Sequence, residues 1–206
     1  MDRKISIVLA GLGGQGVITA TNILGKAAIN ANINVYASEI HGMAQRGCSV
    51  ICTVRMGNVS GPLLATGTAD AMLCTEPIEA LRYIQYANKK TKIITDVTPV
   101  IPFTVSIGLQ EYPDIEYVFE EIRSYAKLYT LDALKISKNA GAPISKNIVM
   151  LGALAASDVL PFSSNVLLET ILDTVPQKYK EINKKAFEEG LKAFQPYKPI
   201  KIKRRK

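Results

Sequence analysis

A glycine-rich turn at residues 11–16, GLGGQG, has residue types and spacing that match a known kind of binding chemistry. Gly11, Gly13 and Gly16 fit the GxGxxG pattern, between a β-branched apolar run and a helical pattern. Glycines permit a sharp turn, and the helix that follows offers unpaired N–H groups to an anion. We predict an anion-binding turn made of Gly11, Gly13, Gly14, Gln15 and Gly16. The alternative is a turn that only lets strand and helix pack.

A second group of polar residues lies in the segment 38–50, SEIHGMAQRGCSV. Glu39 stands 23 positions after Gly16, where a Rossmann protein binds the ribose of a dinucleotide. His41 is the one histidine of the chain. We expect 39–47 to be a loop after a second strand, which would place His41 and Arg46 near the glycine turn because ligands gather at the carboxyl ends of strands. The alternative is a pair that stabilises the loop or forms a contact surface.

The elements that position these residues alternate between strands and helices. Apolar β-branched runs predict strands at 5–10, 33–38, 48–55, 69–75, 92–96 and 127–131. Helical spacing predicts helices at 17–31, 76–86, 116–126, 132–139, 146–157, 164–173 and 178–194, with a Pro-rich loop at 99–113. The first forty residues then form one βαβ unit. We predict an α/β, Rossmann-like, mainly parallel sheet with helices on both faces and a helical C-terminal part.

The charge of the chain is concentrated at its C-terminus. The formal net charge is +7, but six of the basic residues lie in the last nine positions, KPIKIKRRK, where no acid stands. The body is therefore nearly neutral, which argues against a nucleic-acid binder. We predict one domain over 1–197 and a flexible basic tail at 198–206.

Cysteine, histidine and hydropathy patterns exclude several other classes. Three cysteines at positions 48, 52 and 74 include no CxxC pair, so we predict no metal site and no disulfide framework. The uncharged stretch 5–25 contains five glycines and is better explained as strand, turn and helix than as a membrane span. We expect a cytoplasmic protein without a membrane partner.

These motifs carry a resemblance to a known family. GLGGQGVITATNILGKAA (11–28) followed by SEIHGMAQRGCSV (38–50) resembles the β subunits of indolepyruvate:ferredoxin oxidoreductases. More broadly it is similar to the γ domains of the 2-oxoacid:acceptor, or pyruvate oxidoreductase, superfamily. The likeness continues through TEPIEALRYI (75–84), LDALKISKNAG (131–141) and NIVMLGAL (147–154), so it covers nearly the whole chain.

The resemblance implies a function that this chain performs only within a complex. Such enzymes convert a 2-oxoacid and coenzyme A to acyl-CoA, CO2 and reduced ferredoxin, using thiamine diphosphate and [4Fe-4S] clusters. The chain lacks a Gly-Asp-Gly motif and a ferredoxin-type cysteine run, so both cofactors are expected on a large α subunit. No catalytic residue is assigned to this chain. The implied role is to complete the site, with coenzyme A as the ligand of the glycine turn.

Three other functions stay open at this stage. The chain could be a γ subunit for pyruvate or 2-oxoglutarate, a free-standing dinucleotide-binding dehydrogenase, or an assembly module with a vestigial turn. We expect an apolar interface with the α subunit, formed by the loop 39–47 and the small-residue C-terminal helices, and self-association of the isolated chain. Ferredoxin is expected to act through the complex.

Overall fold

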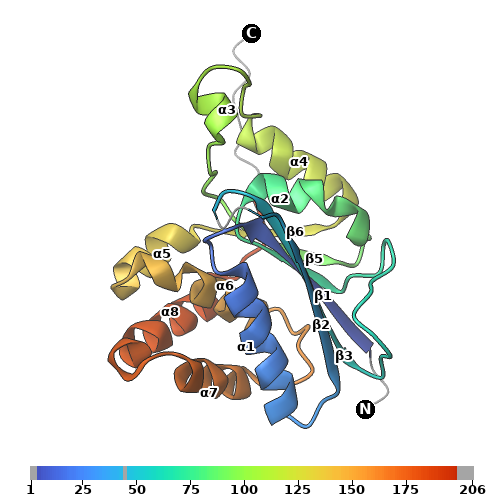
Figure 1. The fold of residues 1–206 in the computed structure, drawn as a ribbon, viewed down its shortest axis with the longest axis vertical. Helices are drawn as coiled ribbons and strands as arrows, with labels where there is room; N and C mark the ends of the chain where they lie inside the picture. Colours follow the sequence, from blue (N-terminus) through green and yellow to red (C-terminus); the bar gives the residue numbers. More distant parts are fainter. Residues whose placement is uncertain (1–3, 44–45, 199–206) are drawn as a thin grey trace.

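A six-stranded sheet lies between two layers of helices in the computed structural model, which describes residues 4–43 and 46–198 (Figure 1). The strands are β1 (Lys4–Leu12), β2 (Val35–His41), β3 (Ser49–Gly57), β4 (Ala71–Cys74), β5 (Lys92–Asp96) and β6 (Lys127–Leu131). The α-helices are α1 (Val17–Asn30), α2 (Pro77–Arg82), α3 (Phe103–Ser106), α4 (Ile115–Tyr125), α5 (Ala133–Ala140), α6 (Lys146–Ala155), α7 (Ser164–Thr174) and α8 (Lys180–Ala193). Short 3-10 helices are η1 (Ile84–Tyr86), η2 (Pro143–Ser145) and η3 (Gln177–Tyr179).

The strand order confirms the α/β class and corrects the expected neighbour of β1. The order is β2-β3-β1-β4-β5-β6, and β1, β4, β5 and β6 run parallel. β3 is antiparallel to both β1 and β2 and separates them. In the sheet, β3 therefore lies between β1 and β2, the two strands of the expected βαβ unit. A short connection lets consecutive strands pair antiparallel, whereas parallel pairing needs a long crossover, so β3 folds back onto β2 and fills the place beside β1.

Two hydrophobic cores cover the two faces of the sheet. Alternate residues of β1 point to opposite faces: Ile5, Ile7 and Leu9 join the core beneath α1 and α6–α8, and Val8 and Ala10 join the core beneath α2 and α4. Figure 1 shows these helix layers on either side of the sheet. β1 is buried along most of its length, as expected for a run of β-branched and small apolar residues with helices on both sides.

The C-terminal helices α6 and α8 pack backbone to backbone. A Cβ on Gly152 would stand 2.2 Å from the carbonyl oxygen of Phe187, and a Cβ on Gly190 would stand 2.1 Å from that of Val149. This close contact lies inside the chain. The small-residue faces of α6 and α8 are used internally, so they are not the outer surface that we expected to meet a partner.

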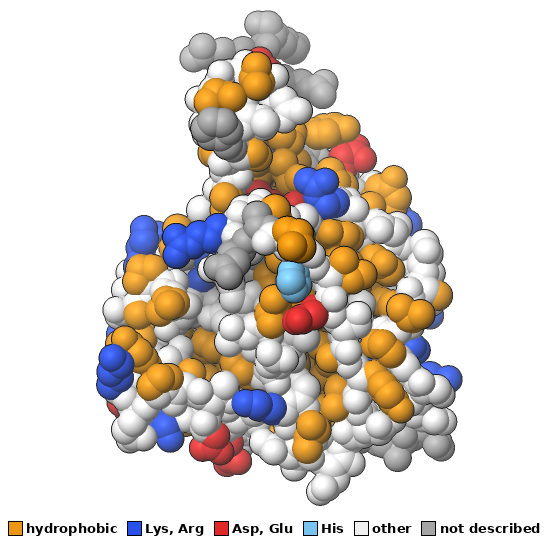
Figure 2. Space-filling model, in the orientation of Figure 1, with side chains coloured by type: hydrophobic (Ala, Val, Ile, Leu, Met, Phe, Trp, Pro, Cys, Tyr) orange, Lys and Arg blue, Asp and Glu red, His pale blue; other side chains and the backbone are white. Residues whose placement is uncertain are grey.

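A projection at residues 99–113 stands beyond the sheet (Figure 1). It was expected to be a loop, and it contains the short helix α3. Four of its large hydrophobic side chains are exposed: Val100, Ile101, Ile107 and Leu109. Figure 2 shows hydrophobic side chains gathered on this part of the surface.

Other boundaries differ in detail from the prediction. β2 extends to His41, so Glu39 and His41 are strand residues and the loop begins at Gly42. The predicted helix 76–86 divides into α2 and η1 because Tyr83 has a non-helical backbone between them. Residues 199–206 of the predicted tail lie outside the described residues, and the single-domain reading of 1–197 stays a prediction.

Candidate functional site

A cavity of about 830 Å³ opens where the carboxyl ends of the central strands meet the N-termini of α1 and α6. Its wall includes residues 12–16 of the glycine turn, the first three residues of α1 and the segment from Pro143 to Ile148. Thr98 and Val100, which follow β5, also contribute. Crevices at the carboxyl ends of strands are the usual ligand sites of open α/β sheets, so this cavity is the candidate site.

Different glycines of the turn have different structural roles. Gly14 and Gly16 have positive φ values of +93° and +78°, which favour glycine. Gly11 is needed for space, because a Cβ there would stand 1.9 Å from the hydroxyl oxygen of Thr75. The Gly13 peptide continues the pairing of β1 with the chain before β3: its N–H donates to the Cys48 carbonyl at 2.8 Å, and its carbonyl accepts from Gly47 at 3.2 Å. Both backbone polar groups of Gly13 are therefore hydrogen-bonded to the segment before β3.

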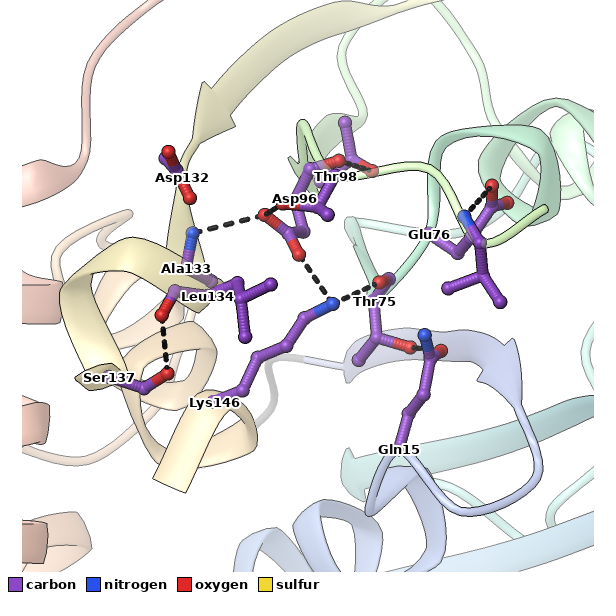
Figure 3. Close-up of polar contacts among 12 residues, drawn as sticks. Gln15, Thr75, Glu76, Asp96, Thr98, Asp132, Ala133, Leu134, Ser137 and Lys146 are labelled. Carbon is purple, nitrogen blue, oxygen red and sulfur yellow. Dashed lines mark hydrogen bonds and ion pairs between the residues drawn. The ribbon is translucent and has the colours of Figure 1, made fainter. Parts of the chain in front are cut away.

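Gln15 closes the turn with its own side chain. Its Oε1 accepts from the Leu12 N–H at 2.9 Å. It also accepts from the Thr75 hydroxyl at 2.5 Å (Figure 3). These contacts connect the end of β1 to the residue after β4. Gln15 thus holds the shape of the turn, a role that its place in the sequence motif did not indicate.

Two helix N-termini face the cavity without a side chain to cap them. Gly16 is the N-cap of the 14-residue α1, and Ser145 is the N-cap of the 10-residue α6; neither makes a side-chain cap hydrogen bond. No acidic residue stands in the first turn of either helix. The first turn of α1 offers unpaired N–H groups, whereas at the start of α6 the N–H groups of Ser145 and Lys146 donate to Ala142 and Pro143 in the preceding 3-10 turn. The positive ends of both helix dipoles lie beside the same space, which suits an anionic group.

Lys146 and Asp96 add an ion pair at this edge (Figure 3). Asp96 ends β5 and is fully buried, and Lys146 begins α6. The Lys146 ammonium also donates to the Thr75 carbonyl at 2.9 Å. The backbone N–H of Ala133 donates to Asp96 Oδ1 at 3.0 Å. The pair thus connects β4, β5, α5 and α6 beside the cavity.

The other sequence-predicted residues lie apart from the cavity wall. Glu39 pairs with Cys52, which pairs in turn with Leu9, so Glu39 lies two strands from β1 and short of the turn. Its side chain is exposed, and it does not occupy the expected ribose position beside β1. The cause is the insertion of β3.

His41 and Arg46 are both exposed, and the structure separates them in their relation to the turn. His41 is level with Val50 and Gly11 across the sheet, and its Nδ1 lies 3.1 Å from the Gly42 carbonyl. Arg46 is the closer one: its Cγ lies 3.7 Å from where a Cβ on Gly14 would stand. The expected approach of Arg46 to the turn is confirmed, but neither Arg46 nor His41 lines the cavity.

Thr75, Asp96, Lys146 and Asn147 are site residues that sequence reasoning missed. The Asn147 side-chain amide donates to the Gly16 carbonyl at 3.4 Å, which joins the two helix N-termini. Two of these residues follow or end predicted strands and two begin a predicted helix, so their places along the chain were a signal. The contacts among these side chains had no such signal, because they depend on the order of the strands in the sheet.

A second buried polar cluster lies behind the cavity, around Glu76 and Glu79. The Glu76 carboxylate accepts from the N–H of Glu79 at 3.0 Å, from the N–H of Val100 at 3.4 Å and from the Tyr112 hydroxyl. Glu79 pairs with Arg82 at 2.9 Å and accepts from the Ser49 hydroxyl. Through the bonds from Val100 and Tyr112, Glu76 holds both ends of the projection 99–113. Glu76 directly follows Thr75 in the chain.

These carboxylates also affect the neighbouring thiol. Burial raises the pKa of Cys74, and the charges of Glu79 and Glu76 raise it further. Cys74 is thus held as a neutral thiol behind the cavity. Within residues 4–43 and 46–198, no group of three or more His, Cys, Asp or Glu side chains is placed to hold a metal ion.

The protein-family model described as pyruvate ferredoxin/flavodoxin oxidoreductase matches residues 6–193. The chain belongs to this family. The resemblance found in the motifs is thereby confirmed, and the match covers the glycine turn, every strand from β2 to β6 and the helices through α8.

Relatives within the family differ in their similarity to this chain. It is 42% identical to the indolepyruvate oxidoreductase subunit IorB of Pyrococcus horikoshii over 194 residues, covering 93% of this chain and 96% of that one. It is 32% identical to the pyruvate synthase subunit PorC of Methanothermobacter marburgensis over 187 residues, covering 88% and 93%.

A solved structure shares the family fold. The 2-oxoglutarate:ferredoxin oxidoreductase of Magnetococcus marinus, determined with 2-oxoglutarate, coenzyme A and succinyl-CoA bound, superposes with a TM-score of 0.71 at 23% identity. The match covers 97% of this chain and 33% of that one. In that enzyme the shared fold therefore forms one part of a longer polypeptide.

Proposed function

We propose that this chain is the small β subunit of an indolepyruvate-type 2-oxoacid:ferredoxin oxidoreductase. The proposed reaction converts an arylpyruvate and coenzyme A to acyl-CoA, CO2 and reduced ferredoxin. The observation that carries the proposal is the difference between 42% identity to an indolepyruvate subunit and 32% identity to a pyruvate subunit, both over most of the chain. The position of Glu39, two strands from β1, argues against the alternative of a dinucleotide-binding dehydrogenase.

The second part of the proposal assigns coenzyme A to the cavity. Its phosphates would lie at the glycine turn, where the N-termini of α1 and α6 meet and Gly13 lines the wall. These donors fit an anionic group, and the related Magnetococcus enzyme was solved with coenzyme A. Coenzyme A, when bound, supplies the thiol that accepts the acyl group.

The third part concerns the partner. We place thiamine diphosphate and the [4Fe-4S] clusters on a large α subunit, which also meets ferredoxin, so this chain is inactive alone. Two separate exposed apolar groups support an interface: Ile40 and Met43 at the end of β2, and the four exposed hydrophobic residues of the projection 99–113. Exposed apolar patches of this kind are typical of binding surfaces, and the isolated chain would self-associate through them.

The cellular place of the complex is also a proposal. The helices in the described part of the chain lack the combination of length and hydrophobicity that a membrane crossing needs. Cys48, Cys52 and Cys74 are all free thiols. We place the complex in the cytoplasm, where thiols stay reduced.

Co-expression with the α subunit tests the substrate assignment. The purified complex should reduce a viologen dye with indolepyruvate and coenzyme A, and more slowly with pyruvate or 2-oxoglutarate. The α subunit and this chain should each be inactive when assayed separately. A preference for pyruvate or 2-oxoglutarate would assign the chain to one of the other γ subunits instead.

A coenzyme A titration of Gly13→Ala tests the ligand assignment. We expect a higher coenzyme A requirement in the complex and a melting temperature close to that of the wild type, because Gly13 lines the cavity wall. A lowered melting temperature with an unchanged titration would show that the turn is structural only.

A further inference from the structure

The cavity wall contains a single charged side chain among its described residues. Among the described residues that line it, Lys146 is the one charged side chain, and none is Asp or Glu. The Lys146 side chain is 13% exposed, so its aliphatic stem is packed. The wall therefore presents one cation beside the N-termini of two helices.

The position of that cation is set by its neighbours. Asp96, the ion-pair partner of Lys146, is fully buried. Its Oδ1 accepts from the Ala133 N–H at 3.0 Å and from the Thr98 hydroxyl at 3.4 Å, which fixes the carboxylate plane. Its Oδ2 contacts the Lys146 ammonium, the ion-pair partner that balances its charge.

Stability alone gives a weak reason for this pair. Burying two charges costs desolvation energy, and apolar replacements of a buried ion pair are often neutral or stabilising. A lysine ammonium has three N–H donors, and the described contacts with Asp96 and Thr75 account for two of them. One donor is left, and Lys146 is a residue of the cavity wall.

We propose that Lys146 binds an anionic phosphate group of the cavity ligand, and that Asp96 is the residue that positions it. The N-terminus of α1 supplies neutral N–H donors, and Lys146 supplies the charge that discriminates a phosphate-bearing ligand from its phosphate-free counterpart. The identity of this ligand as coenzyme A rests on the proposed function. The binding of an anion by Lys146 does not.

The first test uses the full chain and inorganic pyrophosphate, measured by isothermal titration calorimetry. Lys146→Met alone would leave Asp96 buried without its partner, so the informative variant is the double substitution Lys146→Met with Asp96→Asn. We expect it to bind pyrophosphate at least about tenfold more weakly than the wild type, as for the loss of a charge-assisted hydrogen bond. Lys146→Arg, which keeps the charge, should retain binding.

Lys92→Met is the matched control. Lys92 is also a partly buried lysine that donates to a backbone carbonyl, that of Ser157, but it does not line the cavity. The pyrophosphate affinity of Lys92→Met should equal that of the wild type. Equal binding by wild type and double variant, or no binding by the wild type, would overturn the inference.

The second test uses the assembled oxidoreductase and separates the inference from the proposed function. The double variant should raise the KM for coenzyme A and leave the KM for pantetheine, which has no phosphate, unchanged. If pyrophosphate binding depends on Lys146 but the KM for coenzyme A does not, the anion site stands and the coenzyme A assignment fails. Equal increases for both thiols would overturn the role of Lys146 in phosphate recognition.

Discussion

Gly16 and Asn147 join the two helix N-termini that face the cavity. The Asn147 amide donates to the Gly16 carbonyl at 3.4 Å, and a Cβ on Gly16 would stand 2.7 Å from the same amide nitrogen. Gly16 also has φ +78° as the N-cap of α1. Position 16 therefore requires glycine for its backbone conformation and for the space that Asn147 fills.

Gly16→Ala should lower the stability of the chain by at least about 1 kcal/mol, because alanine is strained at positive φ. Urea unfolding of the full chain measures this. Gly25→Ala is the matched control: Gly25 lies inside the same helix with nothing within 4 Å of its Cβ position, so alanine there should stabilise the chain by up to about 1 kcal/mol. Equal midpoints for the two variants would contradict the assigned geometry.

Gly152→Ala tests the contact between α6 and α8. The added methyl group would meet the Phe187 carbonyl oxygen at 2.2 Å, and helix backbones cannot yield as a flexible side chain can. We expect a loss of about 1–3 kcal/mol, as for other overpacked cores. A thermal or urea transition unchanged from the wild type would show that α8 is free to move away.

Two tyrosines should make the chain sensitive to alkaline pH. Burial and the hydrogen bond to Glu76 raise the pKa of Tyr112, and burial and the hydrogen bond to Glu116 raise the pKa of Tyr197. Below the ordinary tyrosine pKa of about 10, both states keep the proton; above it the unfolded chain ionises first, so stability falls as the pH rises.

Unfolding midpoints in urea from pH 8 to above pH 10 check this expectation. The double variant Tyr112→Phe with Tyr197→Phe should start from a lower midpoint, because two hydrogen bonds are lost. Its midpoint should then fall less steeply with pH than that of the wild type. Parallel curves would mean that these hydroxyls do not carry the alkaline transition.

The three thiols should differ in reactivity with a disulfide reagent. Cys48 is half-buried, whereas Cys52 and Cys74 are buried and burial raises the pKa of both. The native chain should therefore react at one thiol, and the other two should react only on unfolding. Cys48→Ser should remove the fast phase; its survival would show that Cys52 or Cys74 is reached through local opening.

Local sequence patterns were sufficient for the elements around the turn. The buried run before Gly11, the glycine spacing and the 3–4 periodicity after Gly16 each depend on neighbouring residues, and all three were predicted. The position of β3 beside β1 was not predicted, because the choice of the strand that pairs with β1 depends on contacts between distant segments. That one difference moved Glu39 away from the expected site.

The charged part of the site was missed for a related reason. Asp96 and Lys146 are fifty positions apart, and each alone reads as an ordinary strand end or helix start. Only the alignment of β4, β5 and α6 at one edge brings their side chains together. Arg46 was predicted near the turn because its loop was expected at the carboxyl end of the second strand, the end at which ligands gather.

The insertion of β3 places the strand β2 away from the cavity. β2 lies at the border of the sheet, whereas the glycine turn follows the central strand β1. Substitution of Ile40, an exposed residue of β2, therefore changes the outer surface of the sheet without changing a residue of the cavity wall. The outer edge of the sheet and the cavity can thus be altered by mutation independently of each other.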